Sequence, residues 1–158
     1  MSSQTGQHIC SLKGHLDFSF ACAWSPNGNL IATGNQDTTV RLYDARNMAS
    51  TLAVFEGRLG ALRALRYFTA FIVLFIVIHF LRFTYDSKLL IAAEPADFVH
   101  VFNIASDQSY TSQIIDFFGE IAGISVCHDY LYIGCADETY GSIMEFERTS
   151  SHSNDIFI

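Results

Sequence analysis

The sequence predicts an all-β protein built from about three similar antiparallel units, with a hydrophobic insert in the second. Short apolar runs alternate with turn signals, and an aspartate suited to a tight turn recurs at Asp37, Asp97 and Asp137. Asp37 and Asp97 are 60 positions apart, and Asp97 and Asp137 are 40 apart. Setting aside the 16 residues 67–82 reduces the first interval to 44, so both intervals fit a repeat of about 40–45 residues.

The first unit has the clearest strand pattern. Its apolar residues alternate with polar ones, and the segments between the runs are rich in Ser, Pro, Asn, Gly and Asp. Strands are predicted at residues 18–24, 30–34, 39–43 and 51–56, with turns at 25–28 and 35–38. Strands this short cannot bury their faces alone, so the unit predicts stacked copies of itself.

The stretch from Gly14 to Asp44 resembles a WD repeat. It opens with Gly14-His15 and closes with Tyr43-Asp44, where the family usually has Trp-Asp. The resemblance implies a partial WD-type β-propeller of about three blades. It also implies a structural clamp of hydrogen-bonded side chains at His15, Thr33, Asp37 and Tyr43. A threonine, a histidine and an aspartate invite comparison with a hydrolytic triad, but nothing here resembles a nucleophile elbow.

The two later units follow the pattern less closely. In the second unit the clamp positions are expected at Arg58, Ala93, Asp97 and Phe102, of which only Asp97 keeps the family's residue type. The third unit is degenerate, and residues 116–147 resemble the C-terminal portion of a little-characterised group of eukaryotic WD-repeat proteins. The predicted organisation is a lead-in or outer strand at 1–13, units at 14–56, 57–104 and 114–147, a polar linker at 105–113, and a frayed Ser-rich tail at 148–158.

Residues 67–82 interrupt the second unit between two near copies, Leu65-Arg66-Tyr67 and Leu81-Arg82-Phe83. The 15 residues from Tyr67 to Leu81 have no formal charge. As a helix they would span roughly 22 Å, which is short of a hydrocarbon core of about 30 Å. The preferred hypothesis is retained-intron or alternatively spliced material inside a blade strand, in a fragment or splice form of a longer WD-repeat protein. The alternative is a short transmembrane segment that anchors an adaptor.

The composition limits the function classes. The formal net charge of −7 argues against a nucleic-acid backbone as the main partner. The four cysteines form no C-x-x-C motif, so reduced thiols in a cytoplasmic or nuclear protein are expected, with a membrane location as the alternative. A zinc site formed by His8, Cys10, Cys127 and His128, and with it a metal-dependent enzyme, stays open as a further alternative.

The resemblance implies a non-catalytic scaffold that binds other proteins through its blade faces and needs no cofactor. Acidic residues fall in several predicted loops that would face a partner: Asp86, Glu94, Asp97, Asp137 and Glu138. Together with the net charge, these carboxylates favour a basic protein surface as the partner. No position combines a nucleophile with an evident base beside it, so catalysis is not expected.

Overall fold

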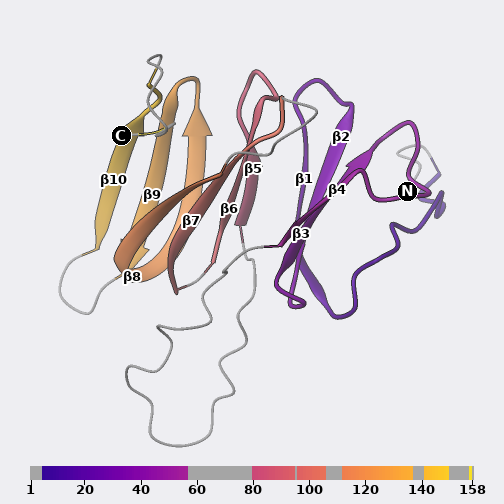
Figure 1. The fold of residues 1–158 in the computed structure, drawn as a ribbon, viewed down its shortest axis with the longest axis horizontal. Coiled ribbons are helices and arrows are strands. Elements are labelled where there is room, and N and C mark those ends of the chain that lie inside the picture. The colour runs from indigo at the N-terminus through magenta and orange to yellow at the C-terminus, as the bar shows by residue number, and fades with distance from the viewer. Residues whose placement is uncertain are drawn as a thin grey trace, which may run out of the picture.

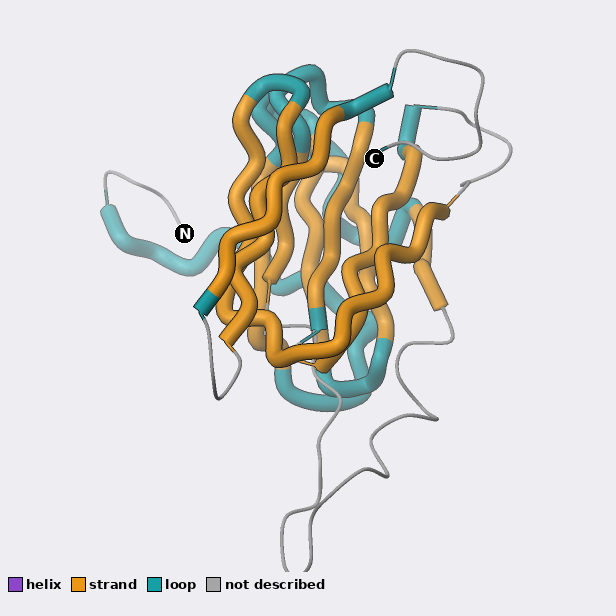
Figure 2. The backbone as a smooth tube through the Cα atoms, turned by 90° about the vertical axis from the view of Figure 1, so that its left-hand side faces the viewer, coloured by secondary structure: helices purple, strands orange, loops and turns teal. Residues whose placement is uncertain are grey.

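The computed structural model describes residues 5–56, 80–94, 96–105, 112–136, 141–149 and 157, and the regular structure in these segments is entirely β (Figure 1). The strands run roughly along one direction, and the turns that connect them collect at the two ends of the molecule (Figure 2). The predicted all-β class is confirmed. Within these segments no helix is long and apolar enough to cross a membrane, and the apolar run at 67–79 lies outside them.

Four strands form the first sheet, in the order β1-β2-β3-β4. Their bounds are Ser19–Trp24 for β1, Leu30–Asn35 for β2, Thr39–Asp44 for β3 and Ala53–Glu56 for β4. Each strand starts and ends within two residues of its prediction. Burial alternates strictly in β4, whereas β2 is buried on both faces. The outer strand expected in the lead-in is not seen, since residues 5–18 contain no strand.

Six strands form the second sheet, in the order β10-β9-β8-β7-β6-β5. Their bounds are Phe80–Phe83 for β5, Leu89–Ala93 for β6, Ala96–Asn103 for β7, Ser112–Cys127 for β8, Tyr130–Ala136 for β9 and Ser142–Glu147 for β10. β8 pairs with β7 through its first half and with β9 through its second half. The second and third units therefore share one sheet, and residues 112 and 113 of the predicted linker already belong to β8. The apolar alternation in residues 114–126 contains no turn signal, which explains the uninterrupted strand.

β5 corrects the predicted boundary of the hydrophobic insert. The sequence spacing ends the insert at residue 82 and joins Arg66 directly to Phe83, but β5 already begins at Phe80. Leu81 and Phe83 are buried and Arg82 is exposed, which is the alternation expected of a half-buried strand. The near copies that flank the insert explain the difference, because either copy can supply leucine, arginine and an aromatic residue before the next turn.

The strands pack as three layers. The first layer is β1–β4, the second is β5, β6, β7 and the first half of β8, and the third is the second half of β8 with β9 and β10. A hydrophobic cluster between the first two layers contains Ala32, Val40, Leu42, Ala53, Phe55, Leu81, Phe83, Leu90, Ala92 and Phe102. β6 lies in the middle layer, so all five of its residues are buried and alternate ones face opposite layers.

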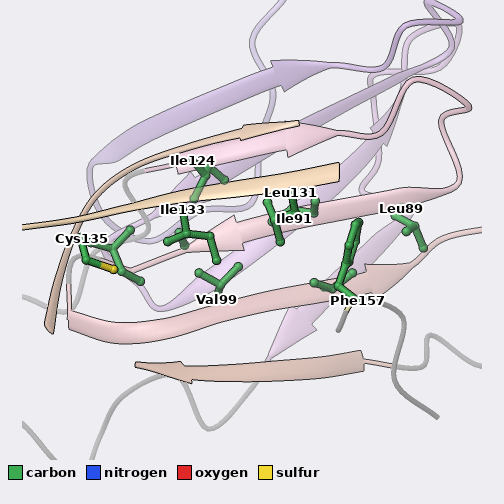
Figure 3. Close-up of a cluster of buried hydrophobic side chains, with 11 residues drawn as sticks. Leu89, Ile91, Val99, Ile124, Leu131, Ile133, Cys135 and Phe157 are labelled. Atoms are coloured by element: carbon green, nitrogen blue, oxygen red, sulfur yellow. The ribbon is translucent and has the colours of Figure 1, made fainter. Parts of the chain in front are cut away.

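A second hydrophobic cluster fills the space between the second and third layers (Figure 3). It contains Leu89, Ile91, Ala93, Val99, Val101, Ile121, Ile124, Leu131, Ile133, Cys135 and Phe157. β6 and β9 are not neighbours in the sheet but contribute to the same cluster, so the sheet folds back on itself at β8. Figure 1 shows the curvature of β8, and a bulge between Ile121 and Gly123 adds to the bend.

One turn is repeated in the first two layers, between β1 and β2 and between β5 and β6, where Gly28 and Ser87 occupy the same place with positive φ angles of 73° and 58°. The β8–β9 turn is shorter, because Cys127 pairs directly with Tyr130, and its positive φ angle of 52° is at His128. In the first two turns a hydroxyl oxygen accepts a hydrogen bond from the N–H five residues later, Ser25 from Leu30 at 2.9 Å and Thr84 from Leu89 at 3.0 Å. β2, β6 and β9 begin at Leu30, Leu89 and Tyr130. Residues of β2 therefore correspond to residues 59 positions later in β6 and 100 positions later in β9.

The end of the chain is held at Phe157, although the tail at 148–158 was expected to fray. The Phe157 ring is buried in the second cluster. The Gln113 side chain holds its backbone on both sides, because Nε2 donates to the Phe157 carbonyl at 2.7 Å and Oε1 accepts from the Phe157 N–H at 2.8 Å. An aromatic ring and a matched amide partner thus fix this residue to the third layer and to β8.

Replacing Phe157 by alanine should lower the free energy of unfolding by about 3–5 kcal/mol, because the missing ring leaves a cavity in the second cluster. Denaturant unfolding of the full chain measures this loss. Leu16→Ala is the matched control, since Leu16 is exposed and its truncation should change stability by less than about 0.5 kcal/mol. Equal stabilities for the two variants would show that the tail does not support the fold.

Candidate functional site

The expected clamp residues meet on the face of the first layer that points away from the second layer. The His15 ring lies between two partners, with Nδ1 3.0 Å from Asp37 Oδ2 and Nε2 2.7 Å from Thr33 Oγ1. An ionised carboxylate can only accept a hydrogen bond, so Nδ1 donates to Asp37. His15 thereby connects the segment before β1 with β2 and with the turn that follows β2.

Asp37 is the acceptor at the centre of this network. Its carboxylate also accepts from the Leu16 N–H at 3.0 Å, from the Thr39 N–H at 3.1 Å and from the Thr39 hydroxyl at 2.7 Å. Burial by itself raises the pKa of Asp37, but the hydrogen bonds from Thr39, Leu16 and His15 outweigh burial and lower the pKa to about 2. The carboxylate is therefore ionised at neutral pH, with its oxygens occupied by internal donors.

Gly14 fixes the path of the chain immediately before His15. Its φ angle of 131° lies in a region that glycine adopts far more readily than other residues. A Cβ at this position would also collide with the Arg41 guanidinium. The Gly-His pair in the sequence therefore has a steric cause, because only glycine lets the backbone place the imidazole over β2 here.

Tyr43 holds the same corner from a different point. Its ring is fully buried, and its hydroxyl donates to the Lys13 carbonyl at 3.1 Å. The hydrogen bonds thus join His15, Thr33 and Asp37 directly, while Tyr43 binds the backbone just before Gly14. A phenol reaches farther from the strand than an indole N–H, so its partner lies on the neighbouring segment.

Asn35 also belongs to this network, although it was not among the clamp residues predicted from the sequence. It is fully buried, and its Nδ2 donates to the Asp17 carbonyl at 2.6 Å and to the Ser19 hydroxyl at 3.0 Å. Its Oδ1 accepts from the Asp37 N–H at 2.7 Å. An asparagine two residues before a turn aspartate is the available signal, because Asn and Asp side chains bind backbone groups two residues later.

The network is suited to holding segments together. The order Asp37–His15–Thr33 matches the connectivity of a hydrolytic triad, but Thr33 is buried within the paired strand β2. A nucleophile needs an exposed hydroxyl at a sharp turn, with donors placed for the oxyanion. Thr33 has neither the exposure nor the turn, so the arrangement stabilises the first layer.

Strand pairing shows what occupies the clamp positions in the second layer. Thr33 lies opposite Arg41, and Ala92 lies opposite His100, so Ala92 and not Ala93 corresponds to Thr33. Asp97 likewise lies one position beyond the equivalent of Asp37. The spacing of Asp37 and Asp97 had aligned the second unit on the first with a shift of one residue. Spacing alone does not define the register of a hairpin, so the shift could not be seen from the sequence.

Glu94 does not face a partner from a loop, as was predicted. Its side chain is 2% exposed, and Oε1 lies 3.2 Å from His100 Nε2, a ring that is equally buried. The His100 ring also stacks on Phe102, with ring centroids 6.1 Å apart. This buried pair was not predicted from the sequence. Its signal was a histidine inside the apolar strand run FVHVF, since a buried imidazole requires a polar partner.

The other predicted partner-facing residues differ in their surroundings. Asp86 lies in the β5–β6 turn, partly exposed and paired with Arg148 at 2.8 Å. Asp97 lies in β7 and not in a loop. Asp137 and Glu138 lie outside the described residues.

The zinc alternative is not supported by the geometry of its proposed ligands. Cys10 lies beside Met48, with 3.0 Å between the sulfur atoms, whereas Cys127 and His128 lie together in the turn of the third layer. Over residues 5–56 and the later described segments, no group of three or more His, Cys, Asp or Glu side chains is arranged to hold a metal ion.

Sequence comparisons place the first unit among known repeats. Residues 6–44 match the family model described as "WD domain, G-beta repeat". Coronin-7 of Mus musculus is 44% identical over 54 residues, which covers 34% of this chain and 6% of coronin-7. "Probable cytosolic iron-sulfur protein assembly protein 1" of Yarrowia lipolytica is 38% identical over 58 residues, or 37% of this chain and 18% of that protein. The chain thus spans less than a fifth of the length of these relatives.

Solved structures share the fold at low identity. Sqt1 of Saccharomyces cerevisiae matches with a TM-score of 0.64 and 18% identity, over 85% of this chain and 33% of the Sqt1 chain. A chain of the mitotic checkpoint complex matches with a TM-score of 0.67 and 16% identity, over 90% of this chain and 39% of that chain. At such identities the likeness concerns the fold alone. It confirms the predicted partial propeller, with the layers as blades.

Asp37→Asn should lower the free energy of unfolding by about 1–3 kcal/mol at about pH 6, because an amide oxygen is a weaker acceptor for the Leu16, Thr39 and His15 donors. The folded pKa of about 2 lies below the ordinary value of 3.8. The ionised carboxylate therefore contributes stability above about pH 4 that is lost as the pH falls towards about 2. The difference between wild type and variant should shrink over that range in urea unfolding, whereas a pH-independent difference would rule out a role for the charge.

Tyr43→Phe should lower the free energy of unfolding by about 0.5–1.5 kcal/mol, because the Lys13 carbonyl loses its donor while the buried ring is kept. Thermal or chemical unfolding measures the change. Tyr85→Phe removes a hydroxyl from an exposed side chain and serves as the control. If both variants unfold like wild type, the Gly14-His15 corner is held without Tyr43.

Proposed function

We propose that this chain is a non-catalytic scaffold of the WD-repeat type, which binds other proteins through the turns at one end of its layers. WD-repeat proteins are generally scaffolds without enzymatic activity, and they bind other proteins. The His15, Thr33 and Asp37 side chains support the proposal, since their polar groups are occupied by one another and by backbone donors.

The observation that carries the proposal is the turn edge, which consists of the β1–β2, β5–β6 and β8–β9 turns at residues 25–29, 84–88 and 128–129. These turns lie side by side at the upper end of the molecule in Figure 1. Neighbouring turns meet through the Asn27 N–H and the Ser87 hydroxyl at 3.3 Å and through the Tyr85 and His128 rings at 6.2 Å. Arg148, just after β10, adds a contact to Asp86 at 2.8 Å. Loops on a rigid β scaffold are common recognition surfaces.

The chemistry of the turn edge favours a basic partner. Asp129 is 70% exposed, with its carboxylate 4.0 Å from Arg148. The exposed Tyr85 ring lies 6.2 Å from the ring of His128, the residue before Asp129. Burial raises the pKa of Asp86, but hydrogen bonds from Thr84, Arg148 and the Lys88 N–H lower it to about 2, so this carboxylate is ionised at neutral pH. Carboxylates next to an exposed phenol ring suit a lysine or arginine side chain, which binds the charge and stacks on the ring.

We also propose a cytoplasmic or nuclear location and an origin by alternative splicing. Cys10, Cys22 and Cys127 are exposed thiols outside any disulfide, as expected in a reducing compartment. The near-copy flanks around residues 67–82 support insertion of a segment into an existing blade. The membrane-anchored adaptor stays a prediction, because residues 67–79 lie outside the described part of the chain.

Combining Asp129→Lys with Tyr85→Ala should reduce the recovery of partner proteins in a pull-down several-fold. The reversed charge repels a basic surface, and the missing ring removes its stacking platform. Asp86 is left intact because it organises its own turn. The matched control is Glu56→Lys with Leu16→Ala, which makes the same chemical changes at exposed sites away from the turn edge.

Recovery with wild type should also fall as salt is raised from about 50 mM to about 500 mM, because exposed charges are screened. Equal recovery with the turn-edge variant and its control would mean that partners bind elsewhere. Recovery only from detergent-solubilised membranes would favour the anchored adaptor instead.

A further inference from the structure

Asp86 carries a charge that the shape of its turn does not require. It occupies the place of Asn27 in the first layer. In both residues Oδ1 accepts one hydrogen bond from a hydroxyl two residues earlier and one from the N–H two residues later. The neutral amide of Asn27 is therefore enough to hold this type of turn, and the negative charge of Asp86 is available for another contact.

The path of the backbone likewise does not require the charge of Arg148. The Arg148 N–H donates to the carbonyl of Asp129 at 2.7 Å, and Ala45 and Ile104 make the equivalent backbone contact in the first two layers. An alanine and an isoleucine at this place show that the contact needs no cation. The guanidinium of Arg148 is thus an addition in the third layer.

The Arg148 guanidinium occupies the oxygen of Asp86 that the turn does not use. Its Nη1 lies 2.8 Å from Asp86 Oδ2 and 4.0 Å from Asp129 Oδ1. The Arg148 and Asp86 side chains are 24% and 31% exposed, and an ion pair this open to water adds little to folding. A cation from outside can therefore replace Arg148 beside Asp86 without disturbing the layers.

We propose that Arg148 is a built-in competitor for the partner's basic side chain, and that an arginine of the partner binds at the turn edge by displacing Arg148 from Asp86. The inference rests on the proposed function, in which carboxylates of the turn edge bind a basic protein surface. A guanidinium is the group that this site already holds. Tyr85, the residue before Asp86, is exposed and offers a ring on which the arriving guanidinium can stack.

The competition has a consequence for specificity. A single cation gains little by replacing Arg148, because one guanidinium is exchanged for another at the same carboxylate. A partner that also contacts neighbouring turn residues gains the free energy of those added contacts. Arg148 therefore lowers the affinity for isolated basic groups and favours partners that fit the whole turn edge.

Fluorescence anisotropy with a labelled hexa-arginine peptide at about 50 mM salt tests the proposal on the full chain. Arg148→Gln removes the competing charge and should tighten peptide binding by about threefold or more. Adding Asp86→Asn should abolish this gain, because the amide holds the turn as Asn27 does but lacks the charge. Arg46→Gln is the matched control, since it removes the same charge and frees Asp44 outside the turn edge, and it should change binding by less than about twofold.

Arg148 forms a partly exposed ion pair, so the unfolding midpoint of Arg148→Gln should stay close to that of wild type. Unchanged or weaker peptide binding by Arg148→Gln would reject competition and would show that Arg148 positions the carboxylates instead. The proposed function would survive that result if Asp129→Lys with Tyr85→Ala still loses peptide binding.

Equal gains with Arg148→Gln and Arg46→Gln would reduce the effect to net charge and equally reject the inference. Peptide binding by Asp129→Lys with Tyr85→Ala that matches wild type would place the basic ligand elsewhere. In that case the proposed function fails, and the inference fails with it.

Discussion

A layer of β-strands with two apolar faces is stable only when both faces are covered, and most of this structure follows from that constraint. The second layer meets it completely, because alternate residues of β6 are buried against the first and third layers. A fully buried leucine or isoleucine contributes about 1.5–3 kcal/mol, so the two clusters are the main source of stability. The outer layers have one covered face each, and they protect the other with local devices: a polar network at one end, tyrosines at the other.

Residues at the same position of the three layers differ in type, because an outer face and a face packed against another layer are different environments. Thr33, on the face of the first layer that points away from the second, becomes Ala92 in the middle layer and Ile133 in the third, both of which are packed against a preceding layer. Asn35 becomes Glu94, which is buried and therefore paired with His100. A buried polar group must be satisfied, and the first layer does this with backbone and side-chain partners from its own lead-in. The clamp is thus specific to the layer that no other described layer covers.

The sequence predicted the features that depend on neighbours along the chain. Strand alternation and turn residues placed β1 to β4, and the repeated hairpins, close to their observed bounds. The features that it did not predict depend on contacts between distant segments. Nothing local to Gln113 indicates that it binds Phe157, 44 residues later. The continuity of β8, and the burial of Glu94 against His100, likewise depend on which strands become neighbours.

In this structure the residues that pack the layers are separate from the residues exposed at the turns, which is compatible with the proposed scaffold function. The strands supply the side chains of the two hydrophobic clusters, and the polar clamp holds the Gly14-His15 corner against the first layer. In the turns of the turn edge the backbone constrains Gly28, Ser87 and His128, which adopt positive φ. In the first two turns the Ser25, Thr84 and Asp86 side chains also hold the loop through hydrogen bonds. The exposed turn positions outside this set can vary with little effect on the layers. Under the proposed function, exposed turn residues such as Tyr85 and Asp129 would determine which partner binds.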